Sequence, residues 1–498
     1  MKNYLMGIDV GTSACKVAVF DENGAVMGSS TRTYQVYYPR AGWAEQNPDE
    51  LWEAICLAVK DIFSERKVAP EDVKCIGVDG QSWSAIPVNR KGEVLARTPI
   101  WMDTRSRDIC EKLKADLGED TIFNVAGNDF LPSYSAPKMI WFRENYPEIH
   151  NTTYKYLQSN SFIVYKLTGV FSQDKSQLYG IQFYDLHKME FNAELASAMG
   201  LSPELIPEIS SCSDIVGKVT AEASRLTGLA EGTPVVAGGL DAACGTLGAG
   251  VYTVGQTQEQ GGQAGGMSIC TDTALAHKSL ILSPHVVPGM YLLQGGTVGG
   301  GGTLKWFRQE LCRDMSFDEI TAEAENIPAG AQGVVFLPYM AGERSPIWDP
   351  DAKGVFYGLG YDRTRGHMIR AVLEGVAYAL QHNIEIAAGA GAEVSVLNAM
   401  GGAANSVLWT QIKSDVTGKK IVVPASDTAT TLGAAILAGV GCGIFGSCGD
   451  AVEKIITVTR THVPNMENHE KYRRYMALFY ELYEDLKGTF SKYRDIMI

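Results

Sequence analysis

The sequence predicts an α/β fold in which helices cover mixed β-sheets. Segments with the apolar runs of strands alternate with segments of helical periodicity over most of the 498 residues. Two apolar strands also end beside glycines and an acid, at Asp9 and at Asp241. A composition of 45% hydrophobic and 20% charged residues is typical of a folded globular protein.

Residues 4–33 predict a β-meander. We expect a strand in YLMGID, a tight turn in GTSACK (11–16), a second strand in KVAVFD, and a hairpin turn through Asn23-Gly24 into a third strand.

Asp9 at the end of the first strand could be a helix cap, a metal ligand or a catalytic base. Turn amides and hydroxyls can hold phosphate oxygens, and a carboxylate beside them can hold Mg²⁺. A polar hairpin with a lone acid is the alternative.

Three segments predict amphipathic helices that pack on the sheets and carry no chemistry. The first covers 49–65, where Pro48 precedes the helix and Asp49 and Glu50 occupy its first turn. The others cover 364–388 and 469–490. The uncharged stretch 428–449 contains six glycines and predicts a buried helix and turn, not a membrane span.

Two polar segments of the first half, 80–89 and 101–106, are candidates for binding a polyhydroxylated ligand. They contain Gln81, Trp101, Asp103 and Arg105, and such groups can pair with many hydroxyls. Trp101 as a core residue, with Asp103 and Arg105 as a surface ion pair, is the alternative.

Residues 233–250 repeat the pattern of an apolar strand, two glycines and an acid, here Asp241, and a small-residue helix follows. Asp241 could face a cleft or could cap that helix. The segment is a weak echo of the N-terminus, so we place a lobe boundary near Gly250 and expect each acid at the inner edge of its own lobe. The expected lobes are 1–250 and 251–498.

Two glycine-rich segments of the second half predict close approach of the backbone to a ligand. Residues 293–307 hold six glycines between 295 and 302, before a helix whose N-terminus favours an anion. A flexible loop is the alternative. Residues 399–423 predict a strand end, a Gly401-Gly402 turn, a helix over 406–416 and another strand; the glycines would admit a flat ring or would serve helix packing.

Several classes of function are excluded by composition and motif. A net charge of −14 argues against nucleic-acid partners. The ten cysteines contain no C-x-x-C pair and predict buried reduced thiols, and no secretory signal opens the chain, so we expect a cytoplasmic protein without membrane association. The chain lacks a Walker A loop, a histidine or cysteine metal motif and a G-x-S-x-G elbow. Among reaction classes, phosphate chemistry is the one that these motifs leave open.

The order of these motifs resembles the FGGY carbohydrate kinases, which belong to the sugar kinase, heat-shock protein 70 and actin superfamily. The resemblance spans GIDVGTSACKVAVFD, GVDGQSW, WMDTRS, GGLDAACGTLGAG, YMAGERSPIWDPDAKGVFYGL, MGGAANSVLWTQIKSDVTG and TLGAAILAG. It implies two ribonuclease-H-like lobes around a central cleft, with sugar mainly on the N-terminal lobe and ATP mainly on the C-terminal lobe.

The resemblance also implies a role for each matching residue. Asp9 matches the acid near Mg²⁺, and Asp241 matches the catalytic base that takes the proton of the sugar hydroxyl. The ATP-binding positions are Gly11, Thr12, Ser13, Lys16, Gly262, Gly301, Gly302, Thr303, Gly401, Gly402, Ala403 and Asn405. The sugar-binding positions are Gln81, Ser82, Trp83, Trp101, Asp103, Arg105 and Asp241.

The implied function is ATP-dependent phosphorylation of a pentulose, with D-xylulose as the first expected substrate because of the W-x-D-x-R motif at 101–105. The chain departs from the motifs usual in the pentulose kinases of this family at Ser82-Trp83, at Ala242 and at Gly262-Gln263-Ala264. Ribulose, gluconate or a fuculose-type sugar stays open as substrate, as does a non-catalytic ATP-gated regulator. The family also suggests a homodimer.

Overall fold

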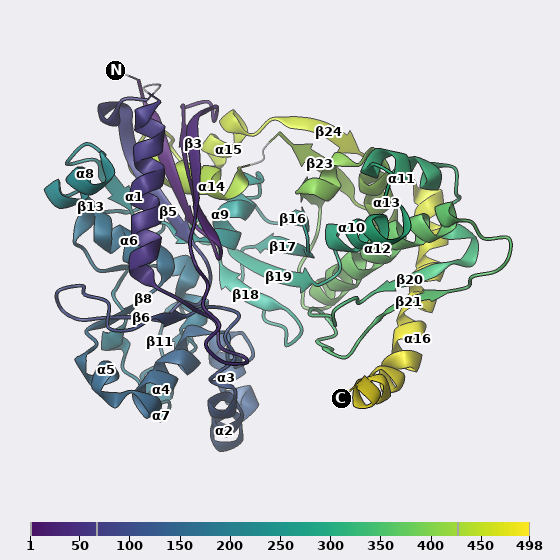
Figure 1. Cartoon of the computed structure of the whole chain (residues 1–498), viewed down its shortest axis with the longest axis horizontal. Coiled ribbons are helices and arrows are strands. Elements are labelled where there is room, and N and C mark those ends of the chain that lie inside the picture. The colour runs from purple at the N-terminus through teal and green to yellow at the C-terminus, as the bar shows by residue number, and fades with distance from the viewer. Residues whose placement is uncertain (1, 66–67, 426–427, 498) are drawn as a thin grey trace.

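In the part of the chain that the structure describes, two seven-stranded mixed sheets form the framework (Figure 1). The computed structural model describes residues 2–65, 68–425 and 428–497. The first sheet contains β1 (Tyr4–Val10), β2 (Ala14–Phe20), β3 (Val26–Thr33), β5 (Val73–Gly80), β13 (Ile215–Lys218), β14 (Pro234–Val236) and β15 (Gly239–Leu240). The second contains β16 (Gln256–Gly261), β17 (Gly265–Thr271), β18 (Ile281–Pro284), β19 (Tyr291–Thr297), β22 (Val396–Met400), β23 (Lys420–Pro424) and β24 (Val458–His462).

The first sheet begins with the expected meander, since β1, β2 and β3 pair antiparallel in chain order. Asp21 closes the hairpin before β3 by accepting hydrogen bonds from the amides of Asn23 and Ala25. The first turn is shorter than predicted: the Gly11 amide donates to the Ala14 carbonyl (3.1 Å), so β2 already starts at Ala14. Lys16 is therefore a strand residue, paired with Asp9 across the ladder.

The strands β5, β14 and β15 extend this sheet in parallel with β1. Because β15 pairs with β5, Asp241 follows a strand of the same sheet that carries Asp9. The expectation that each acid belongs to its own lobe is wrong for this reason. The internal repeat instead relates the first sheet to the second. In the second sheet β16, β17 and β19 form another meander, which β22 and β23 extend in parallel.

Helices cover both faces of the first sheet. The helix α1 (Pro48–Ser64) packs on β2 and β3 and begins one residue before the predicted start, with Asn47 accepting a hydrogen bond from the Asp49 amide. On the other face α9 (Asp241–Gly248) and α14 (Ala429–Gly441) pack together against β1 and β5 (Figure 1).

The contact between α14 and the first sheet joins segments far apart in the sequence. It depends on glycine, because a Cβ at Gly7 or at Gly77 would overlap the carbonyl oxygen of Thr431 or of Ala434. The predicted buried helix of 428–449 thus exists. It ties the second half of the chain to the first sheet, and α15 (Cys448–Ile455) follows beside it.

The other helices of the first half surround this sheet and the loops beneath it. They are α2 (Arg107–Leu117), α3 (Glu119–Ala126), α4 (Ser135–Asn145), α5 (Pro147–Thr152), α6 (Ser159–Thr168), α7 (Ala193–Ala198) and α8 (Ala221–Thr227). Short 3₁₀ turns occupy η1 (Pro70–Asp72), η2 (Lys175–Gly180), η3 (Pro203–Leu205), η4 (Ala331–Gly333) and η5 (Gly402–Asn405).

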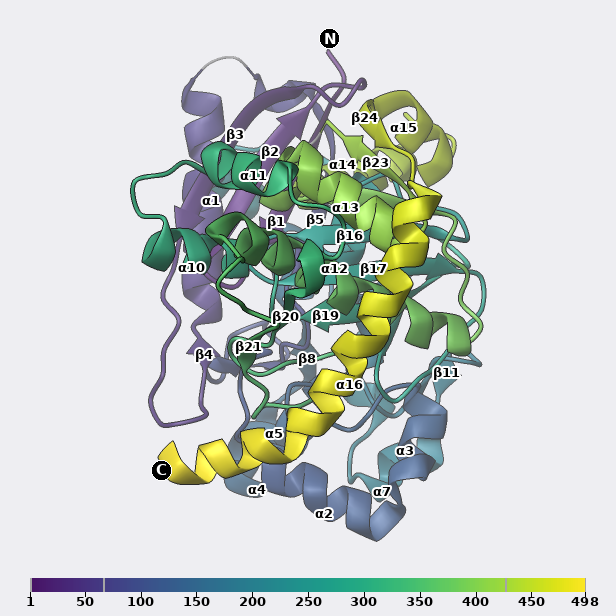
Figure 2. The same cartoon turned by 90° about the vertical axis from the view of Figure 1, so that its right-hand side faces the viewer.

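In the second half, helices build a separate apolar core beside the second sheet. They are α10 (Gly301–Leu311), α11 (Phe317–Glu325), α12 (Arg365–Gly389), α13 (Val407–Thr417) and α16 (Met466–Met497). The predicted helices at 364–388 and 469–490 correspond to α12 and α16, and α16 runs across one side of the molecule past α13 (Figure 2).

Five two-stranded ladders complete the secondary structure of the described residues. They pair β4 (Glu45–Gln46) with β7 (Thr98–Pro99), β6 (Ile86–Val88) with β8 (Lys155–Leu157), β9 (Ser172–Asp174) with β12 (Glu208–Ser210), β10 (Tyr184–Asp185) with β11 (Glu190–Phe191), and β20 (Val335–Pro338) with β21 (Gly354–Tyr357).

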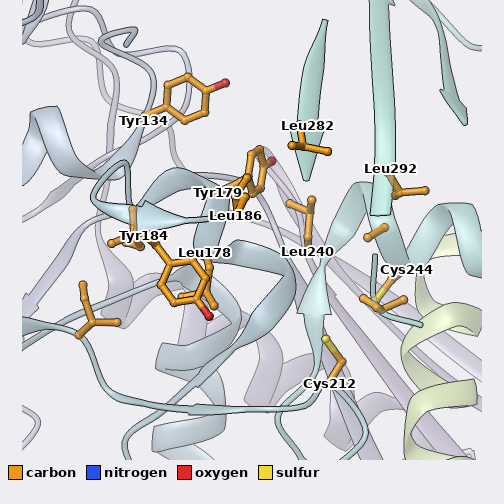
Figure 3. Packing of buried hydrophobic residues seen from close by; sticks show 14 of the residues in the cluster. Tyr134, Leu178, Tyr179, Tyr184, Leu186, Cys212, Leu240, Cys244, Leu282 and Leu292 are labelled. Carbon is orange, nitrogen blue, oxygen red and sulfur yellow. The ribbon is translucent and has the colours of Figure 1, made fainter. Parts of the chain in front are cut away.

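The largest apolar core crosses from the first half of the chain to the second. Leu240 and Tyr179 lie near Leu282 of β18 and Leu292 of β19 (Figure 3). The Asn128 side chain reinforces this junction, because it hydrogen-bonds both the amide and the carbonyl of Leu282 (2.9 and 2.8 Å). Within the described residues, no helix combines the length and the hydropathy that a bilayer crossing requires.

Candidate active site

Three carboxyl groups gather where parallel strands of the first sheet end. Asp9 and Asp79 are direct partners in the β1–β5 ladder, so their side chains share one face of the sheet. Asp241 follows β15, whose Gly239 pairs with Asp79. The carboxyl ends of parallel strands are the usual ligand-binding edge of an α/β sheet. Asp79 has no solvent exposure, whereas Asp9 and Asp241 retain partial access.

The protonation of these acids reflects their burial and their mutual repulsion. Burial raises the pKa of Asp9 to about 6, although contact with Asp79 and the charge of Lys16 oppose the rise. Burial, together with the charge of Asp9, raises the pKa of Asp241 to about 7, and the Ala242 amide opposes this rise (2.6 Å). Burial and the two neighbouring acids hold the pKa of Asp79 well above its usual range. Such perturbed carboxyl groups are typical of functional sites.

The turn after Asp9 is fixed by contacts from outside it. The Tyr34 hydroxyl donates to the Gly11 carbonyl, and Gln46 Nε2 donates to the Thr12 carbonyl (2.6 Å). The side chain of Ser13 is exposed at the tip. The turn is therefore held from the side while its tip stays open to solvent.

The predicted sugar-side residues Gln81 and Trp101 lie against this same turn. Trp101 Nε1 donates to the Thr12 hydroxyl (2.9 Å), and Gln81 Nε2 donates to Gln46 Oε1 (2.5 Å). Two buried polar atoms here, Gln81 Oε1 and Trp83 Nε1, have no hydrogen-bond partner among the described residues. Unpaired buried groups of this kind can be satisfied by ligand hydroxyls.

An aromatic group formed by Trp83, Tyr134 and Tyr179 adjoins these residues. The Trp83 ring lies 4.4 Å from that of Tyr134 and 5.5 Å from that of Tyr179, measured between centroids. Trp83 has a left-handed backbone (φ 60°), which is uncommon for a bulky residue and often marks a functional site. The Tyr179 hydroxyl also donates to the Ser82 hydroxyl (3.1 Å).

Asp103 and Arg105 form an internal ion pair, so the alternative of a surface pair is wrong. The Arg105 guanidinium is 2.8 Å from Asp103 Oδ2 and 2.8 Å from Glu45, and the rings of Trp43 and Trp141 enclose it. Asp103 Oδ2 also accepts from the Ala44 amide (2.7 Å). Asp103 Oδ1 accepts from Arg105 Nε (2.9 Å), so both Asp103 oxygens are used within the protein.

A cavity of about 610 Å³ lies in the second half of the chain, a size typical of small-molecule sites. Of the predicted ATP-side residues it is lined by Gly262, Gly301, Gly302, Gly402, Ala403 and Asn405. Two glycine turns meet beside it: a Cβ at Gly401, whose φ is 85°, would come within 2.9 Å of Gly261. Gly401 serves this close approach, and Thr303 is buried in the first turn of α10.

The N-terminus of α10 is not a free anion site. The amides of Gly301 and Gly302 donate to the carbonyls of Gly262 and Gln263 (2.7 and 2.9 Å). The expectation that this helix start favours an anion is therefore wrong in this structure, because the turn between β16 and β17 caps it.

Sequence reasoning missed several residues of the site. Asp79 carried a signal, an acid inside an apolar strand two residues before Gln81. Lys305, Phe317 and Trp409 line the cavity from α10, α11 and α13. These three follow ordinary helical patterns, so no local signal distinguished them.

The carboxyl groups fit a hard divalent cation. Asp79 faces Asp9, and apart from that carboxyl group neither oxygen of Asp79 has a hydrogen-bond partner among the described residues. Mg²⁺ is commonly held by one or two carboxylates together with substrate phosphates and water. Within the described ranges no group of three or more His, Cys, Asp or Glu side chains could hold a metal ion.

Comparison with known proteins accounts for this combination of features. The model of the FGGY family of carbohydrate kinases, N-terminal domain, matches residues 4–248, and that of the C-terminal domain matches residues 267–442. The chain belongs to the FGGY family. It is therefore a carbohydrate kinase, and such kinases use ATP and a sugar as substrates.

Individual relatives of this FGGY kinase match over nearly their whole length. A xylulose kinase of Staphylococcus epidermidis is 31% identical over 98% of both chains. A gluconokinase of Bacillus licheniformis is 28% identical over 99% of this chain and 98% of its own. A gluconate kinase structure from Lactobacillus acidophilus superposes with a TM-score of 0.92 at 24% identity, covering 99% of this chain and all of the other, which shows the shared two-lobed fold.

Proposed function

We propose that this FGGY kinase transfers the γ-phosphoryl group of ATP to a terminal hydroxyl of a pentulose, D-xylulose in the first place, with the aid of Mg²⁺. The placement of Asp241 beside Asp9, at the carboxyl ends of parallel strands, carries the proposal. The similarity to a xylulose kinase supports the choice of sugar.

Asp241 is the proposed general base. Its carboxylate accepts the proton of the attacking hydroxyl while that oxygen forms a bond to the γ-phosphorus and the bond to the leaving ADP breaks. A pKa of about 7 leaves Asp241 substantially ionised near neutrality and still basic enough to take the proton. Ala242 Nα–H donates to this carboxylate and holds it in place.

Asp9 and the turn after it form the proposed phosphate side. Gly11 closes the turn, because its amide is already bonded to the Ala14 carbonyl, whereas Thr12 and Ser13 offer backbone amides and hydroxyls. Lys16 supplies a positive charge across from Asp9. Bound Mg²⁺ would offset the charge of the phosphate oxygens, and Asp9 would hold it. Tyr34 and Gln46 keep the turn rigid, so little reorganisation accompanies binding.

The glycine-lined cavity is the proposed nucleotide site. Gly402, Ala403 and Asn405 would lie against the adenosine, and Gly262 with Gly301 and Gly302 would border the phosphates. The side-chain-free surface of these glycines leaves room for a flat ring. Since the α10 amides are already bonded, phosphate contacts are expected mainly from the Asp9 turn.

The polar and aromatic residues near Gln81 form the proposed sugar side. Gln81 Oε1 and Trp83 Nε1 would pair with sugar hydroxyls, since both are buried and unpaired. Trp101 would contribute chiefly by holding Thr12 in place. Asp103 and Arg105 are proposed to support the wall of the site, because they are bonded to each other.

Gluconate is the second candidate substrate, and the similarity to a gluconokinase favours it. Our proposal also includes a division into lobes at residues 1–250 and 251–498, a cytoplasmic location and a homodimer. Ten free cysteines, nine of them buried, agree with a reducing compartment. Sedimentation velocity of the purified chain tests the dimer.

A coupled assay of ADP release tests the function directly. The purified protein with Mg-ATP is presented with D-xylulose, D-ribulose, L-ribulose, L-fuculose, D-gluconate and glycerol. We expect the largest kcat/KM with D-xylulose. A dominant response to D-gluconate would replace the sugar assignment, and absence of any sugar-dependent turnover would overturn the proposed function.

A further inference from the structure

Asp79 is a buried acid with no assigned role in the reaction. It is the second-last residue of β5, which lies between β1 and β15, and it has no solvent exposure. Apart from the Asp9 carboxyl group, neither of its carboxyl oxygens has a hydrogen-bond partner among the described residues. An ionised carboxyl group at this position would be strongly destabilising without compensation, so Asp79 stays protonated unless a partner that the protein does not itself supply is bound.

The position of Asp79 indicates that such a partner would also contact Asp9. The two residues are register partners in a parallel ladder, and their carboxyl groups are within hydrogen-bonding reach of each other. Two ionised carboxyl groups at such a distance repel each other, and Asp241 adds a third negative charge nearby. Lys16, across from Asp9, supplies one positive charge against these three acids, so the site remains short of positive charge.

Other buried acids in the same lobe are satisfied by protein groups. Asp174, equally buried, accepts from Ser176, Asn160 and the Gln177 amide. Asp103 has Arg105. Asp79 differs from both in lacking any such donor among the described residues, although it sits on the functional edge of the sheet.

A divalent cation satisfies this geometry. It binds hard oxygen ligands, neutralises two carboxylates at once, and can reach the pair from the side of Asp9 and Asp241, which retain partial solvent access. We propose that Asp79 is a second carboxylate ligand of the divalent cation, beside Asp9. This inference rests on the proposed function, because the nucleotide phosphates complete the coordination.

Asp79 on a rigid central strand would fix the cation relative to the base. Because β5 pairs with both β1 and β15, one strand sets the separations of Asp79 from Asp9 and from Asp241. A cation held by two adjacent strands has less positional freedom than one held by Asp9 alone. The phosphoryl group and the hydroxyl near Asp241 are then aligned by the same sheet.

Binding of Mn²⁺ tests the inference without relying on turnover. Free Mn²⁺ is quantified by electron paramagnetic resonance in titrations of the full-length protein with ADP present. Asp79→Asn and Asp79→Ser are each expected to weaken Mn²⁺ binding at least about tenfold, as is Asp9→Asn. ADP affinity measured by calorimetry in EDTA should stay within twofold of wild type in the Asp79 variants, which shows that they are folded.

A matched control is Asp185→Asn. Asp185 is 5% exposed, lies in the same lobe, and accepts from the amides of His187 and Lys188, which an asparagine carbonyl can still do. Its Mn²⁺ affinity is expected to equal that of wild type. A tenfold loss in this variant as well would show that carboxylate removal acts nonspecifically and would overturn the inference.

Unchanged Mn²⁺ affinity in both Asp79 variants would overturn the proposal and indicate that Asp79 shares a proton with Asp9. Should neither variant fold, crystals of the unaltered protein with Mn²⁺ and ADP decide by anomalous scattering whether the ion lies at a bonding distance of about 2.1–2.2 Å from Asp79. A longer distance overturns it. Failure of the proposed function is recognised separately, as wild-type protein without sugar-dependent ADP release.

Discussion

Asp241 is the residue on which the proposed chemistry depends most. Asp241→Asn keeps the size and the hydrogen bond from Ala242 but removes the proton acceptor. We expect turnover to fall by about 10²–10⁴-fold, while calorimetry finds sugar and ADP affinities near those of wild type. Turnover within threefold of wild type would remove Asp241 as the base. Asp185→Asn serves as the control, since that acid lies outside the site.

The raised pKa of Asp241 predicts how activity changes with pH. The base works only when ionised, so kcat/KM should rise about tenfold per pH unit below pH 7 and level off above it. The folded-state pKa of about 7 exceeds the usual carboxyl value of 3.8, so the favourable contribution to stability is complete below pH 3.8 and is lost as the pH rises toward 7.

A pH–rate profile at several Mg²⁺ concentrations measures this behaviour. A limb that comes from Asp9, whose pKa is about 6, should move to lower pH as Mg²⁺ increases, whereas the limb from Asp241 should move less. A profile that is flat from pH 5 to pH 8 would contradict both assignments.

At the scale of elements, the contact between α14 and the first sheet is sensitive to a single methyl group. Gly77→Ala would drive Cβ into the Ala434 carbonyl, a backbone atom that cannot rotate away. We expect a loss of about 1–3 kcal/mol in the free energy of unfolding, measured by urea denaturation. Gly389→Ala is the control: its Cβ would meet no atom within 4 Å, so stability should be unchanged or slightly increased.

The glycine turn after β22 gives a matching prediction for the nucleotide site. Gly402 lines the cavity, and a Cβ there would meet no atom within 4 Å, so a larger side chain can be accommodated without refolding. Gly402→Leu should raise the KM for ATP at least about tenfold, equivalent to roughly 1.4 kcal/mol, and leave the KM for sugar nearly unchanged. Initial-rate kinetics would check this.

Gly389→Leu places the same side chain in similarly open space, on the exposed end of α12 and away from the cavity. It should leave both KM values unchanged. Equal effects of the two leucines on the KM for ATP, or an effect of Gly402→Leu on the KM for sugar alone, would show that the nucleotide binds outside this cavity.

For the whole molecule, the packing of α14 predicts that the first lobe is incomplete without the end of the chain. A protein of residues 1–250 exposes the face of β1 and β5 that α14 covers. We expect it to lack cooperative unfolding and near-ultraviolet circular dichroism. The same lobe carrying residues 428–456 on a glycine-serine linker should regain both, and cooperative unfolding of 1–250 alone would contradict this interpretation.

Local pattern was sufficient for much of the secondary structure. Pro48 and the acids after it predict the start of α1, Asn23-Gly24 predicts the turn into β3, and apolar periodicity predicts α12 and α16. These features depend on neighbours within a few residues, so the sequence displays them directly. The family resemblance, which rests on motifs in a fixed order, then supplied the carbohydrate kinase class.

The tertiary structure decided which groups meet. Strand pairing, which brings residues far apart in sequence into register, put Asp79 beside Asp9 and moved Asp241 to the same sheet. Helix packing from α10, α11 and α13 closed the cavity, and burial turned Asp103 and Arg105 into an internal pair. The sequence by itself thus determined the elements and the class of chemistry. Only long-range packing determined the geometry of the site, because no local pattern encodes a pairing between distant strands.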